Sequence, residues 1–272
     1  MITALRTRGI EIAFDEAGHG NPVVLLHGFP LNRSMWSEQV EALRTNYRVI
    51  TPDLRGHGET TVAHEPATME ESALDVAALL DELKIESASV AGLSMGGYVA
   101  LAFCHLYPHR VSSLILADTH AVTDSDDARR GREESAQRAL REGMDAITET
   151  MIPKLLSPET LARKSEIVAR VREMINGTRP EGAAAALRGM AVRRDQTSFL
   201  SEISIPTLIL VGSDDSLTPP KEAALMHRAI RDSRMVTIER AGHLSNVEQP
   251  EAFNRALLDF LAAVYPQPRT PR

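Results

Sequence analysis

Cysteine is almost absent from this sequence, since Cys104 is the single one in 272 residues. One cysteine cannot form a disulfide within the chain, and such scarcity is typical of proteins that work in a reducing compartment. Long apolar runs are also lacking, because the stretch at 23–26 is far too short to span a bilayer. No basic leader followed by an apolar core stands at the N-terminus, so no secretory signal is visible. We therefore expect a cytoplasmic protein without a membrane partner.

Aromatic residues are scarce as well, and acidic residues outnumber basic ones. Phe, Trp and Tyr together make up 4% of the residues, the net charge is −7, and no long basic run is present. These features argue against a general nucleic-acid-binding protein, which needs a basic surface. Phosphate-loop, H-E-x-x-H metal and G-x-G-x-x-G dinucleotide motifs are missing too. We expect a small molecule as the binding partner, no nucleic acid and no metal or organic cofactor; homo-oligomer formation is left open.

Short apolar runs alternate with helical patterns along most of the chain. Nearly continuous apolar runs are typical of strands that are covered on both faces, and residues 71–83 carry apolar side chains at the spacing of one helical face. An N-terminal pair, 4–7 and 10–14, favours instead an antiparallel hairpin at the sheet edge. The alternation predicts an α/β fold, with a mostly parallel sheet flanked by helices on both faces. The candidate parallel strands are 23–26, 47–50, 88–91, 114–117, 207–211 and 235–238.

The stretch 121–200 interrupts this alternation, because it contains no convincing strand. An acidic first turn, an N-cap followed by proline, an Asn-Gly stop and an alanine-rich run indicate a series of helices. An insertion at the carboxyl end of parallel strands lies where ligands bind in such sheets, so we interpret it as an inserted helical lid. The signals are Asp124, Asp126 and Asp127; Ser157 and Pro158; Asn176 and Gly177; and residues 182–187.

The expected organisation is therefore one core with an insertion. Residues 1–120 and 201–265 form the core, and residues 121–200 form the helical lid, or cap. The Pro-rich residues 266–272 form a flexible tail. We expect the sheet to supply the chemistry and the lid to select the substrate.

The stretch from Gly92 to Gly96 carries the strongest functional signal. Its letters, Gly-Leu-Ser-Met-Gly, match the nucleophile elbow G-x-S-x-G. A predicted strand precedes it and a helical run follows it, so the hydroxyl of Ser94 should project above a sharp strand-to-helix turn. Small residues suit so tight a turn. We predict that Ser94 is a nucleophile, with a structural serine in a glycine-rich turn as the alternative.

A serine hydroxyl needs a base to remove its proton and an acid to orient that base. His243 is the candidate base, because it comes late in the chain, just after the last predicted strand. Asp215, which closely follows a predicted strand, is the preferred acid. Its neighbour Asp214, and Asp118 at the end of an earlier strand, are the alternatives. The resulting order of Ser, Asp and His differs from the two protease orders.

An oxyanion that develops during acyl transfer needs hydrogen-bond donors. The amide of Met95, directly after the predicted nucleophile, is one candidate. The amide of Phe29, in the loop after the strand at 23–26, is the other. In the same loop, Gly28 permits close approach of the backbone to a ligand. We expect His27 to anchor the loop rather than to transfer a proton.

Taken together, these residues resemble the α/β-hydrolase fold superfamily, over roughly residues 20–120 and 203–262. Within it the sequence is most similar to the 3-oxoadipate enol-lactonase group and its carboxylesterase and cofactor-free haloperoxidase-like relatives. The resemblance implies that residues 53–58 form a structural loop beside the site, and it adds Trp36 to His27 and Gly28 as candidate substrate-binding residues. The motifs that carry it are His27-Gly28-Phe29-Pro30, Trp36, Asp53-Leu54-Arg55-Gly56-His57-Gly58, Gly92-Leu93-Ser94-Met95-Gly96-Gly97, the segment from Gly212 through Pro219, and Gly242-His243.

The predicted function is hydrolysis of small carboxylic esters or lactones by a serine esterase with a Ser-His-Asp catalytic triad. Ser94 would attack the carbonyl and form an acyl-serine intermediate, which water then hydrolyses without a cofactor. Dehalogenases and epoxide hydrolases of the superfamily have aspartate at the elbow, which Ser94 excludes. In the lid, Met151, Leu155 and Met190 are the apolar residues expected near the pocket, with packing inside the lid as the alternative.

Two other functions stay open. Carbon–carbon bond hydrolases of ring-cleavage keto acids keep the serine but commonly have Asn where Leu93 stands. They also need a lid group that binds a substrate carboxylate, for which Arg193 and Arg194 are candidates, with a solvated charged pair as the alternative. A non-catalytic ligand receptor could use the same fold, although a receptor has no need of a complete triad.

Overall fold

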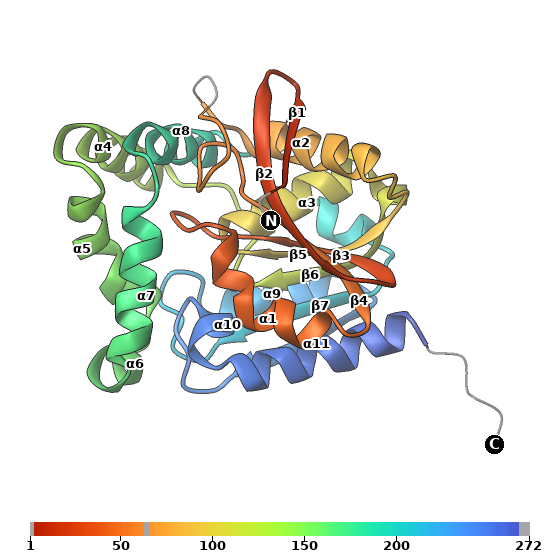
Figure 1. The fold of residues 1–272 in the computed structure, drawn as a ribbon. Coiled ribbons are helices and arrows are strands. Elements are labelled where there is room, and N and C mark those ends of the chain that lie inside the picture. The colour runs from red at the N-terminus through yellow and green to blue at the C-terminus, as the bar shows by residue number, and fades with distance from the viewer. Residues whose placement is uncertain (1–2, 63–65, 267–272) are drawn as a thin grey trace.

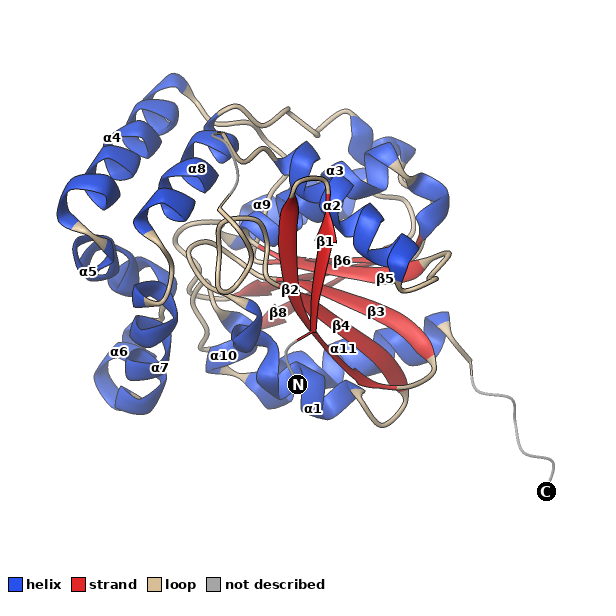
Figure 2. Ribbon diagram, turned by 45° about the horizontal axis from the view of Figure 1, so that its top comes forward, coloured by secondary structure: helices blue, strands red, loops and turns tan. Residues whose placement is uncertain are grey.

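The computed structural model describes residues 3–62 and 66–266 of the chain. They form an eight-stranded sheet in the order β1-β2-β4-β3-β5-β6-β7-β8, with helices on both faces (Figures 1 and 2). β2 pairs in antiparallel fashion with β1 and β4, and every other neighbouring pair is parallel. The strands are β1 (Thr3–Thr7), β2 (Ile10–Gly18), β3 (Asn21–Leu26), β4 (Tyr47–Pro52), β5 (Ala88–Leu93), β6 (Val111–Ala117), β7 (Thr207–Gly212) and β8 (Ser233–Ile238).

The middle of the sheet is buried on both faces. All six residues of β5 and all six of β7 are buried, and so are the last four residues of β3. Complete burial of an apolar side chain such as Leu or Val contributes roughly 1.5–3 kcal/mol. This explains why the sequence of these strands is continuously apolar rather than alternating. Each predicted strand is confirmed, inside a somewhat longer observed strand, as is the N-terminal hairpin.

Helices cover the two faces of the sheet (Figures 1 and 2). α1 (Ser37–Leu43) and α11 (Pro250–Val264) pack together on one face, and α2 (Met69–Glu82) and α3 (Met95–Leu106) pack together on the other. α9 (Pro220–Ala229) packs against β7 and β8. The remaining short helices of the core are η1 (Arg33–Trp36), η2 (Pro108–Arg110), η3 (Phe199–Glu202) and α10 (Ser245–Glu248).

A group of five helices stands between β6 and β7 in the chain and gathers at one side of the sheet (Figure 1). Residues 121–200, all of them described, contain no strand. Ser157 caps α6 by accepting a hydrogen bond from Thr160 N, and α7 ends before Gly177. The helical character predicted for this stretch is therefore confirmed. The helices are α4 (Asp126–Glu142), α5 (Met144–Leu155), α6 (Pro158–Arg163), α7 (Ser165–Asn176) and α8 (Pro180–Ala191).

One helix start differs from the prediction. α4 begins at Asp126, and Ser125 is its N-cap, whose hydroxyl oxygen accepts a hydrogen bond from Ala128 N. Asp124 precedes the helix and is buried against two arginine side chains, so it does not belong to the acidic first turn. Of the predicted tail, residues 267–272 lie outside the described residues. Within the described part of the chain, no helix combines the length and the apolarity needed to cross a membrane.

Candidate active site

Ser94 lies on the sharp turn between β5 and α3. Its φ is +55° and its ψ is −115°, a backbone conformation that costs free energy for a residue with a side chain. Hydrogen bonds fix the turn: Ser94 N donates to Ala117 O at 2.9 Å, and Ser94 O accepts from Gly97 N and Thr119 Oγ1, both at 2.9 Å. The turn is thus held by the neighbouring strand β6 as well as by its own helix.

Glycines make this turn sterically feasible. A Cβ atom on Gly92 would lie 2.1 Å from Gly96 O, and a Cβ atom on Gly96 would lie 2.1 Å from Leu26 O. Both clashes involve backbone atoms, which cannot move aside as a flexible side chain can. A larger residue at either position would push α3 away from β3 and β5, and Ser94 would move with it.

His243 and Asp215 form a buried hydrogen-bonded pair. His243 Nδ1 donates to Asp215 Oδ2 at 2.9 Å, and the imidazole is only 2% exposed. Asp215 Oδ1 accepts from the amides of Leu217 and Thr218, both at 2.9 Å, and Oδ2 also accepts from Thr218 Oγ1 at 2.6 Å. The loop after β7 therefore orients the carboxylate, and the carboxylate orients the imidazole.

The two members of this pair change each other's pKa. Burial acts to raise the pKa of Asp215, but the charge of His243 and the hydrogen bonds from His243 and Thr218 outweigh it and lower the pKa overall. Burial acts to lower the pKa of His243, but the charge and hydrogen bond of Asp215 raise it overall. An imidazole whose protonated form is stabilised in this way suits a group that accepts a proton from a neighbour.

The other two candidate acids have different surroundings. Asp214 is exposed, its backbone N–H donates to Ala241 O, and its carboxylate accepts from Ser213 Oγ at 3.3 Å. Asp118 is fully buried behind the pair and accepts hydrogen bonds from Gly212 N and Ser245 Oγ. Burial, with the nearby charge of Asp215, raises the pKa of Asp118 to about 8. Asp215 is thus the acid that the fold brings to His243.

Ser94 and His243 open onto the same cavity, which has a volume of about 500 Å³. Its wall comes from the core and from helices α4, α5 and α8. Phe29, Met151 and Met190 are among the predicted residues that line it. The lining residues are Phe29, Ser94, Tyr98, His120, Asp124, Ala128, Gly131, Arg132, Ser135, Met151, Lys154, Leu187, Met190, Leu217, Thr218 and His243.

The two amides predicted to face an oxyanion belong to Met95, directly after Ser94, and to Phe29, which lines the same cavity as Ser94. Met95 is the first residue of α3, so its N–H has no acceptor inside the helix. Phe29 stands in the loop after β3, and its amide donates no hydrogen bond to any residue among those described. Gly28 lies close by, because a Cβ atom there would be 3.5 Å from Ser94 Cβ. Both N–H groups are free to donate to a ligand.

Four residues predicted to bind substrate do not line the cavity: Gly28, which has no side chain to reach it, and His27, Trp36 and Leu155. His27 is fully buried, donates from Nδ1 to Gly28 O at 3.0 Å and accepts Leu54 N at Nε2, so it anchors the loop. Trp36 is also fully buried and packs against Phe253. Leu155, the last residue of α5, is fully buried, and its carbonyl oxygen accepts a hydrogen bond from Leu244 N of the core at 3.1 Å. These side chains support the site from behind.

The segment 53–58 forms a closed structural loop. The Asp53 carboxylate accepts the backbone amides of Arg33 at 2.8 Å and Glu59 at 2.9 Å, and it pairs with the Arg33 guanidinium. Gly58 has a φ of +49°, and a Cβ atom there would lie 2.1 Å from the Asp53 carboxylate. The Asp53 carboxylate is occupied by these contacts, and Asp53 does not line the cavity around Ser94.

Polar residues that the sequence reasoning missed also line the cavity. Tyr98 donates or accepts a hydrogen bond of 3.0 Å with His120 Nε2, and Arg132 and Lys154 project from α4 and α5. The position of His120 just after β6, at the carboxyl edge of the sheet, was a signal that could have found it. Arg132 and Lys154 gave no such signal, because nothing in the sequence shows which face of these helices meets the core.

The alternative that Arg193 and Arg194 form a solvated charged pair is only half correct. Arg194 is exposed, but Arg193 is 5% exposed and pairs with Asp124 at 2.7 Å. Its guanidinium also donates to the carbonyl oxygens of Met190 and Val122, both at 2.9 Å. Arg193 is buried because these acceptors and the Asp124 carboxylate together satisfy its donors.

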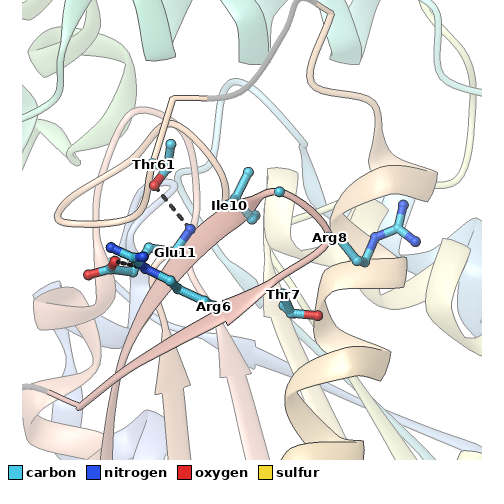
Figure 3. A pocket seen from close by; sticks show the side chains of 7 residues that line it. Arg6, Thr7, Arg8, Ile10, Glu11 and Thr61 are labelled. Atoms are coloured by element: carbon cyan, nitrogen blue, oxygen red, sulfur yellow. Dashed lines mark hydrogen bonds and ion pairs between the residues drawn. The ribbon is translucent and has the colours of Figure 1, made fainter.

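A second hollow of about 500 Å³ lies at the tip of the β1–β2 hairpin (Figure 3). Arg6 lies along Glu11 there, with Nε 3.0 Å from Oε2, and Glu11 N donates to Thr61 Oγ1 at 3.0 Å. The residues that line this hollow include neither a histidine nor a serine, so they offer no nucleophile and base like Ser94 and His243. Residues 3–62 and 66–266 include no group of three or more His, Cys, Asp or Glu residues able to hold a metal ion.

Comparisons with known proteins give matches along nearly the whole chain. The sequence model of the alpha/beta hydrolase fold matches residues 21–250. The curated 3-oxoadipate enol-lactonase 2 of Acinetobacter baylyi is 33% identical over 226 residues, which are 83% of this chain and 83% of the relative.

Two solved structures are similar in fold and in sequence. A thermophilic esterase from Thermogutta terrifontis, in a malate-bound form, has a TM-score of 0.93 and 47% identity, over 97% of this chain and 98% of that one. The enol-lactonase from Burkholderia xenovorans has a TM-score of 0.90 and 30% identity, over 96% of this chain and 100% of that one.

Proposed function

The chain belongs to the alpha/beta hydrolase fold family, and we propose that it is a serine hydrolase that cleaves small carboxylic esters or lactones through an acyl-serine intermediate. Relatives named as an enol-lactonase and an esterase support this class of reaction. The observation that carries the proposal is that Ser94, on its strained turn, lines the same cavity as His243, which is bonded to Asp215.

The first half of the proposed reaction forms the acyl-enzyme. His243 takes the proton from Ser94 Oγ through its free Nε2, because Nδ1 is engaged by Asp215. Ser94 Oγ then attacks the carbonyl carbon, and the amides of Phe29 and Met95 stabilise the negative oxygen of the tetrahedral intermediate. The intermediate collapses when His243 returns the proton to the leaving alkoxide. For a lactone, the leaving alkoxide or enolate stays attached to the acyl group.

The second half repeats these steps with water. His243 removes a proton from a water molecule, the hydroxide attacks the acyl carbon, and the same two amides stabilise the new oxyanion. His243 then returns the proton to Ser94 Oγ, and the carboxylic acid leaves. The carboxylate of Asp215 stays ionised throughout and stabilises the imidazolium that forms in each half, consistent with its lowered pKa.

We also propose that helices α4, α5 and α8 act as the lid of this site. They contribute half of the cavity wall, including Met151 and Met190. The side chains that these helices place in the cavity do not include a nucleophile paired with a base, as Ser94 and His243 are in the core. We infer that the helices contribute to catalysis through the shape of the cavity, the exclusion of water and charge.

A substrate panel tests the proposed function. Purified protein is assayed against p-nitrophenyl esters of increasing acyl length, against simple aliphatic lactones, and against an enol-lactone. We expect turnover of the short esters or of the lactones, with a lag-free burst of p-nitrophenol when deacylation is the slower step. A folded protein that turns over no ester or lactone would contradict the proposal and favour a binding protein on the same fold.

A further inference from the structure

The cavity around Ser94 carries more positive than negative charge. Among the described residues that line it, Arg132 and Lys154 are cationic and Asp124 is the one acid. His120 adds no charge near neutral pH, because burial lowers its pKa to about 4. The chain as a whole has a net charge of −7. The sign of the charge in the cavity is therefore opposite to that of the molecule.

Asp124 does not neutralise this charge, because two arginines share it. Arg193 Nη1 lies 2.7 Å from Asp124 Oδ1, and Arg132 donates to both carboxylate oxygens. Burial acts to raise the pKa of Asp124, but the hydrogen bonds and charges of the two arginines lower it overall, so it is ionised. Asp124 therefore does not neutralise Arg132 alone, because Arg193 shares the same carboxylate.

Two strong donors on this wall lack a strong acceptor. The nearest partner of Arg132 Nη1 is the thioether sulfur of Met190, at 3.4 Å, which is a weak acceptor. Lys154 makes no hydrogen bond or ion pair with any residue of the described chain. A ligand oxygen with negative charge would satisfy both groups better than the protein does.

A third polar atom, on the side of the wall formed by the core, also lacks a partner. His120 Nδ1 is buried without a hydrogen bond to any described residue, whereas its Nε2 is bonded to Tyr98 at 3.0 Å. Buried polar atoms are nearly always paired, because an unpaired one costs free energy. His120 lines the cavity, but its Nδ1 is covered by protein, so the proposal rests on the two cations and not on this atom.

We propose that Arg132 and Lys154 form an anion subsite, and that the preferred substrates are esters or lactones that carry a second, ionised carboxylate. This inference rests on the proposed hydrolysis at Ser94. A guanidinium and an ammonium group supply charge-assisted hydrogen bonds to a carboxylate, and such bonds are about twice as strong as neutral ones. An uncharged acyl or alkoxy chain would gain nothing from either cation.

The first experiment measures the hydrolysis of two matched pairs of esters by the wild-type protein. The acyl-side pair is monomethyl glutarate against methyl pentanoate, and the alcohol-side pair is pentanoyl glycolate against ethyl pentanoate; within each pair, a carboxylate replaces a methyl group. We expect kcat/KM to favour the carboxylate ester about tenfold in one pair, as one charge-assisted hydrogen bond would give. The pair that shows the preference identifies which side of the scissile bond faces the subsite. Equal kcat/KM values in both pairs would overturn the proposal.

The second experiment changes the cation that is least constrained by the fold. Lys154 is exposed, so Lys154→Gln and Lys154→Glu should fold normally by circular dichroism. The preference ratio should fall in Lys154→Gln and invert in Lys154→Glu, mainly through KM. The matched control is Lys221→Glu, an exposed lysine of α9 that does not line the cavity, and it should keep the wild-type ratio. A ratio that survives Lys154→Glu would overturn the subsite.

A binding measurement separates failure of the subsite from failure of the proposed function. Titration calorimetry with glutarate needs no turnover, and we expect Lys154→Glu to weaken binding about tenfold relative to wild type and Lys221→Glu. Glutarate binding that depends on Lys154, in a protein that hydrolyses no ester, would support the subsite and contradict the hydrolase. Ester hydrolysis by a protein that does not bind glutarate would support the hydrolase and contradict the subsite.

Discussion

Asp214 and Asp215 are neighbours in the sequence, but the folded loop surrounds them differently. The amides of Leu217 and Thr218 converge on Asp215, whereas Asp214 remains exposed to solvent. Both residues follow β7, so the sequence alone favoured one without excluding the other. The choice depends on how the loop turns back on itself, and that depends on contacts with His243, a residue 28 positions later in the chain.

The two aspartates should therefore respond differently to the same substitution. Asp215→Asn should lower kcat/KM on the order of 10³-fold or more, because an amide favours the wrong imidazole tautomer and cannot stabilise the imidazolium. Asp214→Asn should stay within about threefold of wild type, since its side chain is exposed. Steady-state kinetics with a short p-nitrophenyl ester measure both. A dead Asp214→Asn, or an inactive Asp118→Asn beside an active Asp215→Asn, would mean that the acid is misassigned.

The raised pKa of His243 predicts the pH dependence of activity. Only the neutral imidazole can accept the Ser94 proton, so kcat/KM should fall as the pH drops through the pKa of His243 in the free enzyme. Asp215 stabilises the protonated form, so the midpoint should lie above the ordinary histidine value near 6.5. A kcat/KM profile between pH 5 and 9 tests this with an uncharged ester. A midpoint well below that value would mean that the charge of Asp215 does not act on the base.

At the scale of elements, the strands were predictable and the faces of the lid helices were not. β3, β5 and β7 are buried on both sides, so continuous apolar runs marked them, and the motif residues followed at their carboxyl ends. The lid helices are instead amphipathic, and their apolar residues pack either on one another or on the cavity. The sequence does not distinguish the two, because that choice is made by how the helices dock on the sheet.

Substitutions at three lid residues test which apolar side chains face the cavity and which pack away from it. Met151 and Met190 line the cavity, whereas Leu155 is fully buried away from it. Met151→Ala and Met190→Ala should change the ratio of kcat/KM between short and bulky acyl esters, because each enlarges the cavity. Leu155→Ala should leave that ratio unchanged and lower stability by about 2–5 kcal/mol. Thermal unfolding and kinetics on two esters measure both effects. The account of the lid would be wrong if all three variants lowered every rate by one common factor.

At the scale of the whole molecule, the exposed large apolar side chains of the described residues are spread along the chain. The large apolar side chains that are exposed among the described residues come from different elements and loops along the chain. Single exposed apolar residues of this kind are normal for a protein surrounded by water. They are Leu106, Val122, Leu140, Leu161, Val192, Leu217 and Leu225. Exposed apolar residues that are spread in this way favour a protein surrounded by water over one adsorbed at a lipid interface.

The molecule should therefore prefer dissolved esters to lipid droplets. Soluble short-chain esters should be hydrolysed faster than emulsified long-chain triglycerides at equal ester concentration, because only dissolved molecules reach the cavity without interfacial adsorption. A pH-stat assay that crosses the solubility limit of a short triglyceride provides the comparison. A sharp rise in rate when the emulsion forms would contradict this expectation.

The central claim is that Ser94 forms the covalent acyl intermediate, and the most direct measurement compares wild type with Ser94→Ala. Both are incubated with a short p-nitrophenyl ester, then initial rates are measured and the quenched proteins are digested for mass spectrometry. The account predicts an acyl adduct on the Ser94 peptide of wild type, and a rate at least about 10³-fold lower in a folded Ser94→Ala without the adduct. A folded Ser94→Ala that retains more than about a tenth of the wild-type rate would contradict the claim.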